Sequence, residues 1–187
     1  MNQEQALSLL KETKLVAILR GIPVKQATDI ATALYDGGVR VLEFTFDHDD
    51  PDCVAHNCQR IRAVKKIFGD EMVVGCGTAL TVQEVEASVE AGGQIVISPN
   101  VDVSVIAKTK ALGAISMPGA LTPTEIVMAY NAGADIVKLF PAGTLGVPYI
   151  KAVRGPLGYI PMSAVGGVRP ETIADFLNAG VCGFGVG

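Results

Sequence analysis

A short unit recurs along this chain: a helical segment ends in a small residue and glycine, and an apolar strand follows at once. Clear instances are "YDGGVRVLEFTF", "EAGGQIVISP", "ALGAISMPG", "NAGADIVKLFP" and "NAGVCGFGVG". Glycine at each junction suits the left-handed residue that commonly ends a helix. Strands that are apolar throughout are typical of a parallel sheet covered by helices. This repeat restricts the fold more than any other feature of the sequence.

The number of units predicts a barrel. With the further apolar segments "KLVAILRG", "EMVVGCG" and "IPMSAVGG", we expect eight strands, at 15–19, 40–46, 72–76, 94–98, 114–117, 135–139, 161–165 and 182–186. Helices are expected between them, at 24–36, 51–67, 81–91, 102–111, 122–131, 147–155 and 170–179. Eight strands alternating with helices favour an α/β fold of the (β/α)8 type, a TIM barrel. A doubly wound open sheet is the alternative, and eight units would be long for it.

The expected barrel is small and differs from the standard pattern at both ends. An extra helix, 3–13, precedes the first strand. The helix that would complete the eighth unit is absent from this chain, which ends at Gly187. The 187 residues are few beside the roughly 250 that are usual for this fold. No linker or change in composition marks a second domain, so residues 1–187 are expected to form a single barrel domain.

Composition and charge exclude several classes of function. The net charge is −4 and tryptophan is absent, so neither a basic patch nor a base-stacking platform indicates nucleic-acid binding. No apolar run reaches 18 residues, and the polar N-terminus does not resemble a signal peptide. The four cysteines form no CxxC pair and indicate reduced thiols in a cytoplasmic protein. Cys53, His56 and Cys58 fit no standard metal-site spacing, so no metal is expected.

Two ionisable residues stand within strands that are otherwise apolar. They are Glu43 in "RVLEFTF" and Lys138 in "DIVKLFP", and Arg20 follows the first strand. An uncompensated buried charge costs several kcal/mol, so we expect both groups to point into the barrel mouth and to meet partners there. Barrel active sites lie at this end. The structural alternatives are a lysine that reaches the surface and a simple salt bridge.

These three residues could together perform carbonyl chemistry. Burial and a nearby cation lower the pKa of a lysine, and the neutral amine attacks carbonyl carbon to form a Schiff base. Lys138 is the candidate nucleophile, Glu43 the candidate proton carrier, and Arg20 the candidate ligand of an anionic substrate group.

Glycine-rich strand ends supply the other candidate site residues. Gly166 and Gly167 follow the seventh expected strand, where barrel enzymes commonly bind phosphate through backbone N–H groups. Thr78 ends "GCGT" and could donate its hydroxyl to a substrate oxygen, and Pro99 lies in "SPN", which reads as a rigid turn at the rim.

Seven of these segments, in order, resemble one known family. "VAILRG", "VLEFT", "VGCGT", "ISPN", "MPG", "VKLFPA" and "AVGGV" together are similar to the 2-keto-3-deoxy-6-phosphogluconate (KDPG)/4-hydroxy-2-oxoglutarate (KHG) aldolases. The resemblance covers essentially the whole chain. It implies a class I aldolase, a lyase on a small (β/α)8 barrel that is usually a homotrimer and needs no metal or other cofactor.

By position, the resemblance implies a role for each candidate residue. Lys138 would form the Schiff base and Glu43 would be the general acid and base. Substrate would be bound by Arg20, Thr78, Pro99, Phe140, Gly166 and Gly167. One position departs from the pattern: Asp47 stands where many members carry an arginine that helps bind the anionic end of the substrate.

The expected reaction is cleavage of KDPG, or of a related 2-keto-3-deoxy sugar acid or 4-hydroxy-2-oxoglutarate, to pyruvate and an aldehyde such as glyceraldehyde 3-phosphate. The stereochemistry of the sugar acid and the need for its phosphate stay open. Two alternatives also stay open. One is a sugar-phosphate isomerase or epimerase with Glu43 as its base. The other is a non-catalytic protein that binds sugar-acid phosphates, which Asp47 and the absent last helix would favour.

Overall fold

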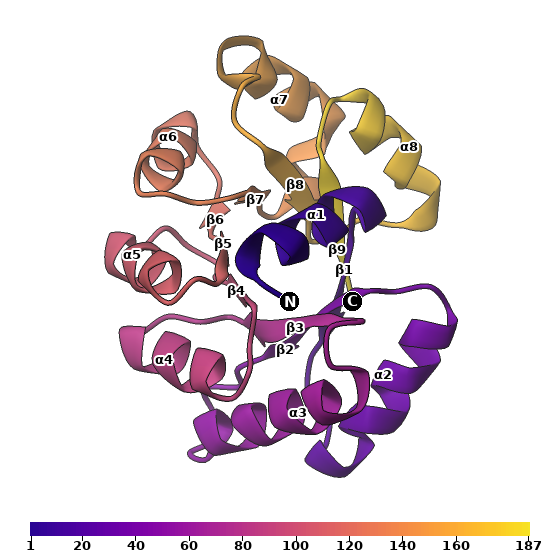
Figure 1. Cartoon of the computed structure of the whole chain (residues 1–187). Coiled ribbons are helices and arrows are strands. Elements are labelled where there is room, and N and C mark those ends of the chain that lie inside the picture. Colours follow the sequence, from indigo (N-terminus) through magenta and orange to yellow (C-terminus); the bar gives the residue numbers. More distant parts are fainter.

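The computed structural model describes residues 1–187 and contains one parallel sheet surrounded by helices (Figure 1). The strands are β1 (Leu15–Leu19), β2 (Val41–Thr45), β3 (Val73–Gly77), β4 (Ile95–Ile97), β5 (Ile115–Met117), β6 (Gly119–Ala120), β7 (Val137–Leu139), β8 (Met162–Val165) and β9 (Gly183–Val186). The helices are α1 (Gln3–Thr13), η1 (Val24–Gln26), α2 (Ala27–Asp36), α3 (Cys53–Phe68), α4 (Val82–Glu90), α5 (Val103–Ala111), α6 (Pro123–Asn131), α7 (Ala142–Leu157) and α8 (Pro170–Asn178).

The strand order confirms the predicted barrel. Neighbouring strands follow the order β5-β4-β3-β2-β1-β9-β8-β7-β6, so strands adjacent in sequence are adjacent in space, and β1 joins β9. A doubly wound sheet would instead reverse direction from its first strand. All eight expected strands are present, and the extra N-terminal helix is present as α1.

The fifth expected strand differs from its prediction because it is broken into β5 and β6. Pro118 separates the two halves and cannot donate a backbone hydrogen bond to a ladder. β5 pairs with β4, whereas β6 pairs with β7, with Gly119 opposite Lys138. The backbone N–H of Lys138 donates to the carbonyl of Pro118 at 2.8 Å. The chain therefore changes partner at this proline, which closes the barrel beside the lysine.

Side-chain caps begin four of the helices, α1, α4, α5 and α6, and are absent from α2, α3, α7 and α8. Thr81 and Thr122 form capping boxes with glutamates at the third helical position. α7 begins five residues before the predicted 147–155 helix, and it contains a non-helical residue, Gly146, with φ 73°. The short turn before this glycine carries Gly143, whose N–H donates to the carbonyl of Gly166 at 2.8 Å. This extra turn thus supports the loop after β8.

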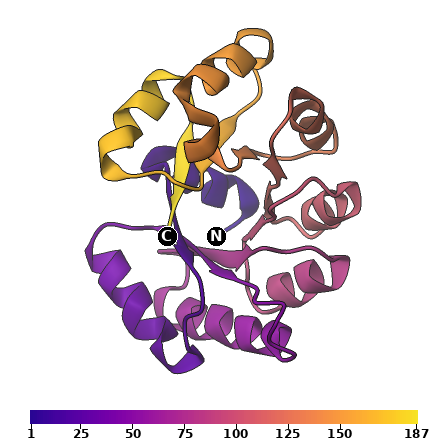
Figure 2. The same ribbon diagram turned by 180° about the vertical axis from the view of Figure 1, so that it is seen from behind.

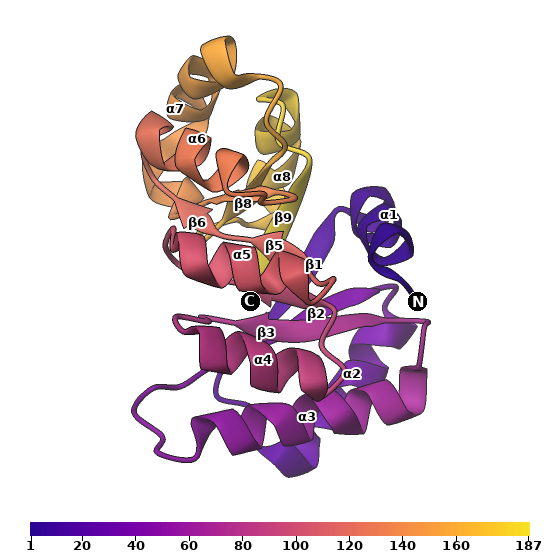
Figure 3. The ribbon, with the colours of Figure 1, turned by 60° about the vertical axis from the view of Figure 1, so that its left-hand side comes forward.

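The barrel interior is apolar up to its C-terminal end. Its side chains belong to one buried cluster with Ala6 and Leu10 of α1, namely Val16, Val41, Val73, Ile95, Ile97, Ile115, Met117, Ile136 and Val165. α1 lies across the N-terminal end of the barrel, inside the ring of the other helices (Figures 1 and 3). Viewed from behind, α1 lies behind the strands and no helix crosses the opposite end (Figure 2). The C-terminal ends of the strands are therefore not covered by a helix.

None of the helices has both the length and the apolar character needed to cross a membrane.

Candidate active site

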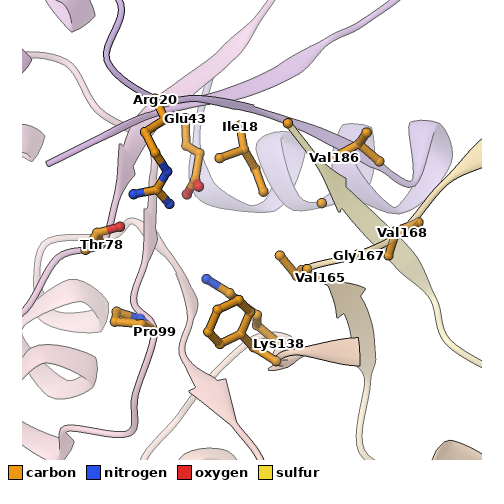
Figure 4. Close-up of a pocket in the computed structure, with 14 residues that line it drawn as sticks. Ile18, Arg20, Glu43, Thr78, Pro99, Lys138, Val165, Gly167, Val168 and Val186 are labelled. Atoms are coloured by element: carbon orange, nitrogen blue, oxygen red, sulfur yellow. The ribbon is translucent and has the colours of Figure 1, made fainter. Parts of the chain in front are cut away.

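A cavity of about 320 Å³ lies at the C-terminal ends of the strands (Figure 4). The structure brings all eight residues predicted from the sequence to its wall: Arg20, Glu43, Thr78, Pro99, Lys138, Phe140, Gly166 and Gly167. Glu43 and Lys138 lie within β2 and β7, and the other six residues follow the ends of β1, β3, β4, β7 and β8. Because these strands are parallel and neighbouring, residues far apart in sequence meet at one edge.

Lys138 points into this cavity because of the alternation along β7. Its neighbours Val137 and Leu139 are buried on the outer face against helices, so the side chain between them faces the barrel interior. Lys138 is 6% exposed. Burial lowers the pKa of its ammonium group, the Glu43 carboxylate raises it, and the Arg20 guanidinium lowers it again. Nζ lies 4.8 Å from the centroid of the Phe140 ring, which forms part of the apolar surroundings.

Glu43 faces the lysine from the other side of the cavity, as Figure 4 shows. It lies on β2 beside Ile18 of β1 and Gly75 of β3, and it is 2% exposed. Its Oε2 atom has no hydrogen-bond partner, and the carboxyl forms no ion pair with Lys138. Burial raises the pKa of Glu43 to about 7, although the charges of Lys138 and Arg20 oppose this. A carboxyl group with this pKa both gives and takes protons near neutral pH.

Arg20 and Thr78 form the rim of the cavity. Arg20 follows β1 directly and is exposed at the mouth, with no ion pair of its own. Thr78 follows β3 and has φ 58°, a left-handed conformation that is uncommon for a β-branched residue. Such strain persists only where the surrounding structure imposes it, and it is frequent at functional sites. The rim therefore offers an unpaired cation and a hydroxyl group.

The glycine pair after β8 forms another part of the wall. Gly166 and Gly167 have φ values of 84° and 73°, which side chains rarely tolerate. A Cβ atom on Gly166 would lie 3.0 Å from the Phe140 ring, and one on Gly143 would lie 2.9 Å from the backbone of Gly167. The same pair borders a second cavity, whose wall includes Arg169. The loop therefore exposes bare backbone next to a cation.

Asp47 is not part of the main cavity. It borders a separate hollow that shares Arg20 and Thr78 with it. The Asp47 carboxylate is exposed and accepts a hydrogen bond from the backbone N–H of Asp49 at 3.3 Å. Asp47 therefore lies outside the main cavity, in a hollow whose wall also includes Arg20 and Thr78.

Six further residues complete the wall and are not among the eight predicted site residues. They are Ile18, Val165, Val168, Gly185, Val186 and Gly187. Ile18 and Val165 could have been predicted from the sequence, because strand alternation places their side chains on the same face of the sheet as Glu43 and Lys138. The structure also contains no cluster of three or more histidine, cysteine, aspartate or glutamate side chains that could hold a metal ion.

Comparison with known proteins agrees with this arrangement. The family model described as KDPG and KHG aldolase matches residues 7–187. The chain is 37% identical over 177 residues to a probable 2-dehydro-3-deoxy-6-phosphogalactonate aldolase of Rhizobium meliloti (strain 1021), covering 94% of this chain and 81% of that protein. It is 36% identical over 174 residues to the 2-dehydro-3-deoxy-6-phosphogalactonate aldolase of Escherichia coli (strain K12), covering 92% and 82%.

The fold agrees as well. A solved structure described as native KDPGal superposes with a TM-score of 0.85 at 36% identity, over 92% of this chain and 82% of that one. Both the whole-length family match and the identity to these relatives lead to the same conclusion: the chain belongs to the KDPG and KHG aldolase family.

Proposed function

We propose that this protein is a class I aldolase that cleaves a phosphorylated 2-keto-3-deoxy sugar acid to pyruvate and glyceraldehyde 3-phosphate. One observation carries the proposal: a buried lysine with a lowered pKa shares a cavity with a buried carboxyl group whose pKa is about 7. Lys138 is the nucleophile and Glu43 is the general acid and base.

The reaction begins with the neutral amine of Lys138. It attacks the C2 carbonyl carbon of the substrate, and the resulting carbinolamine loses water to give a protonated imine. Glu43 in its protonated form donates the proton that lets the hydroxyl group leave as water. The imine carbon is then a strong acceptor of electrons.

Cleavage uses Glu43 in its ionised form. The carboxylate takes the proton of the C4 hydroxyl, the C3–C4 bond breaks, and its electron pair moves into the imine to form an enamine. The aldehyde leaves. The enamine takes a proton at C3, and water hydrolyses the new imine to release pyruvate and free Lys138.

The two ends of the substrate meet different cations. Arg20, with the hydroxyl of Thr78, is placed to bind the carboxylate beside the imine, and Pro99 and Phe140 line the pyruvate pocket. The terminal phosphate is assigned to the backbone of the glycine pair after β8, with Arg169 supplying positive charge beyond it. This arrangement needs no arginine at position 47, so Asp47 does not weaken the proposal.

The 6-phosphogalactonate-derived acid is the first substrate to test, because both relatives described above carry that activity in their names. The phosphogluconate-derived acid is the second. We also propose that residues 1–187 form one domain, that the protein is a cytoplasmic homotrimer, as the family resemblance implies, and that it binds neither nucleic acid nor membranes. Its four cysteines are free thiols, in keeping with that compartment.

Borohydride trapping tests the proposal directly. The protein is incubated with pyruvate, reduced, digested and mapped by mass spectrometry. A reduced pyruvyl adduct is expected on Lys138. Lys138→Met should abolish it, whereas Lys151→Met, at an exposed lysine of α7, should leave it intact. A folded wild-type protein without the adduct would overturn the aldolase proposal and favour an isomerase or epimerase with Glu43 as its base.

A further inference from the structure

Gly77, the last residue of β3, lies directly against the carboxyl group of Glu43. A Cβ atom built on Gly77 would lie 2.3 Å from Oε2, 2.4 Å from Cδ and 2.5 Å from Oε1 of that side chain. These are its three nearest heavy atoms, and all are closer than two nonbonded atoms can approach. The carboxyl group therefore occupies the space that any side chain at position 77 would need.

The backbone gives no other reason for a glycine here. Gly77 does not have the positive φ seen at Gly166 and Gly167. It pairs with Thr45 in the regular register of β2 and β3, and its carbonyl accepts a hydrogen bond from the N–H of Phe46 at 2.8 Å. Any residue can adopt this extended conformation. What the position requires is the absence of a Cβ atom.

This space determines where the Glu43 carboxyl group can rest. Against β3 it is buried, its Oε2 atom has no hydrogen-bond partner, and it stands apart from Lys138 without an ion pair. The carboxyl is the free end of a flexible side chain. If the space were filled, it would turn toward the open cavity, where the Lys138 ammonium and the Arg20 guanidinium lie.

We propose that Gly77 is a positioning residue of the reaction, because its missing side chain lets the Glu43 carboxyl group rest against β3 instead of pairing with Lys138. The inference depends on the proposed roles of Glu43 and Lys138. An ion pair between them would hold the lysine in its unreactive protonated form and would keep the carboxyl group ionised. Gly77 thereby keeps the nucleophile and the proton carrier apart until substrate enters.

The first test is Gly77→Ala. We expect a folded protein whose kcat for aldol cleavage falls about 100-fold, the lower end of what a positioned acid or base contributes. Because the ion pair would hold Lys138 protonated, the acidic limb of the pH–rate profile should move to higher pH, and trapping of pyruvate on Lys138 should likewise require higher pH. An unchanged profile, with only the amount of folded protein reduced, would indicate a merely structural role and overturn the inference.

A double-mutant cycle with Glu43→Ala makes the test independent of folding yield. Without the carboxyl group the space is free, so adding Gly77→Ala should change neither kcat nor the melting temperature any further. Gly75→Ala is the matched control: its Cβ atom would lie 1.8 Å from the carbonyl oxygen of Ile95, so its cost should be equal in both backgrounds.

Each outcome of the double-mutant cycle either supports or contradicts the role of Gly77. If Gly77→Ala alone fails to fold but the double variant folds, the contact with Glu43 is supported. If the double variant also fails, or if the two effects are additive, the inference is wrong. Pyruvate trapping on the wild-type protein separates this from the proposed function, because the adduct on Lys138 forms whether or not Gly77 has the role argued above.

Discussion

Replacing Glu43 by glutamine should stabilise the protein, and the gain should depend on pH. The pKa of Glu43 is about 7 in the folded protein, compared with an ordinary value of 4.5. Between these values the folded state binds more protons than the unfolded state, so the free energy of unfolding falls as pH rises. Glutamine carries no charge and removes that loss. The stability that Glu43→Gln gains from this removal, relative to the wild type, is therefore absent below pH 4.5 and complete above pH 7.

The magnitude follows from the same two pKa values. At about 1.4 kcal/mol per pH unit, the separation between 4.5 and 7 corresponds to about 3 kcal/mol. Any cost of burying the amide of the glutamine adds a constant at every pH and does not affect this difference. We therefore expect the stability of Glu43→Gln relative to wild type to rise by about 3 kcal/mol between pH 4 and pH 8.5.

Urea unfolding of both proteins at half-unit steps of pH measures this difference, with the slope of the transition as a check that both remain two-state. A relative stability that stays flat across the range would refute the reasoning, since the carboxyl group would then have an ordinary pKa. Lys138→Met supplies a second check. The ammonium of Lys138 lowers the pKa of Glu43, so without it the pH-dependent loss should grow and extend to higher pH.

Three further substitutions test how individual contacts affect stability and, for the first two, activity. Asp135→Ala, at the opposite end of the barrel, removes the acceptor for Lys110 Nζ at 2.6 Å and should cost about 2 kcal/mol in urea unfolding, with pyruvate trapping unchanged. Thr78→Gly should relieve its left-handed strain and raise the free energy of unfolding by about 1 kcal/mol while kcat/KM falls. Gly119→Ala would place a Cβ atom 2.4 Å from the carbonyl oxygen of Pro99, so the melting temperature should drop by several degrees; an unchanged value would contradict the close approach of the two backbone segments at that turn.

The barrel could be predicted from the sequence because the same short pattern recurs along the chain. Each unit repeats the same helix end and apolar strand, and the sum of many weak signals determines strand number and order. The break in the fifth strand escaped prediction because it depends on a change of partner at Pro118, which is a property of two neighbouring strands rather than of one segment.

Site residues could be predicted most directly from the sequence where a charged side chain stands in an otherwise apolar strand. Lys138 and Glu43 are conspicuous as charges in apolar strands, and both lie in the cavity. Gly77 could not be recognised in the same way, because a glycine in "GCGT" is equally compatible with a turn. Its significance appears only when its distance from a side chain of another strand is known.

The two buried charges of the cavity also have opposite effects on stability. Glu43 has a raised pKa, so it lowers stability as pH rises from 4.5 to about 7. Lys138 has a lowered pKa, so it lowers stability as pH falls through the range below 10.5 in which the unfolded chain is protonated and the folded lysine is not. Each group carries a cost of burial that the charge of the other offsets only in part. The same burial makes loss of a proton from Lys138 and gain of a proton by Glu43 less costly, so the instability of the empty site and its readiness for proton transfer have the same cause. The apolar barrel interior and α1, which contribute nothing to the chemistry, supply the stability that tolerates it.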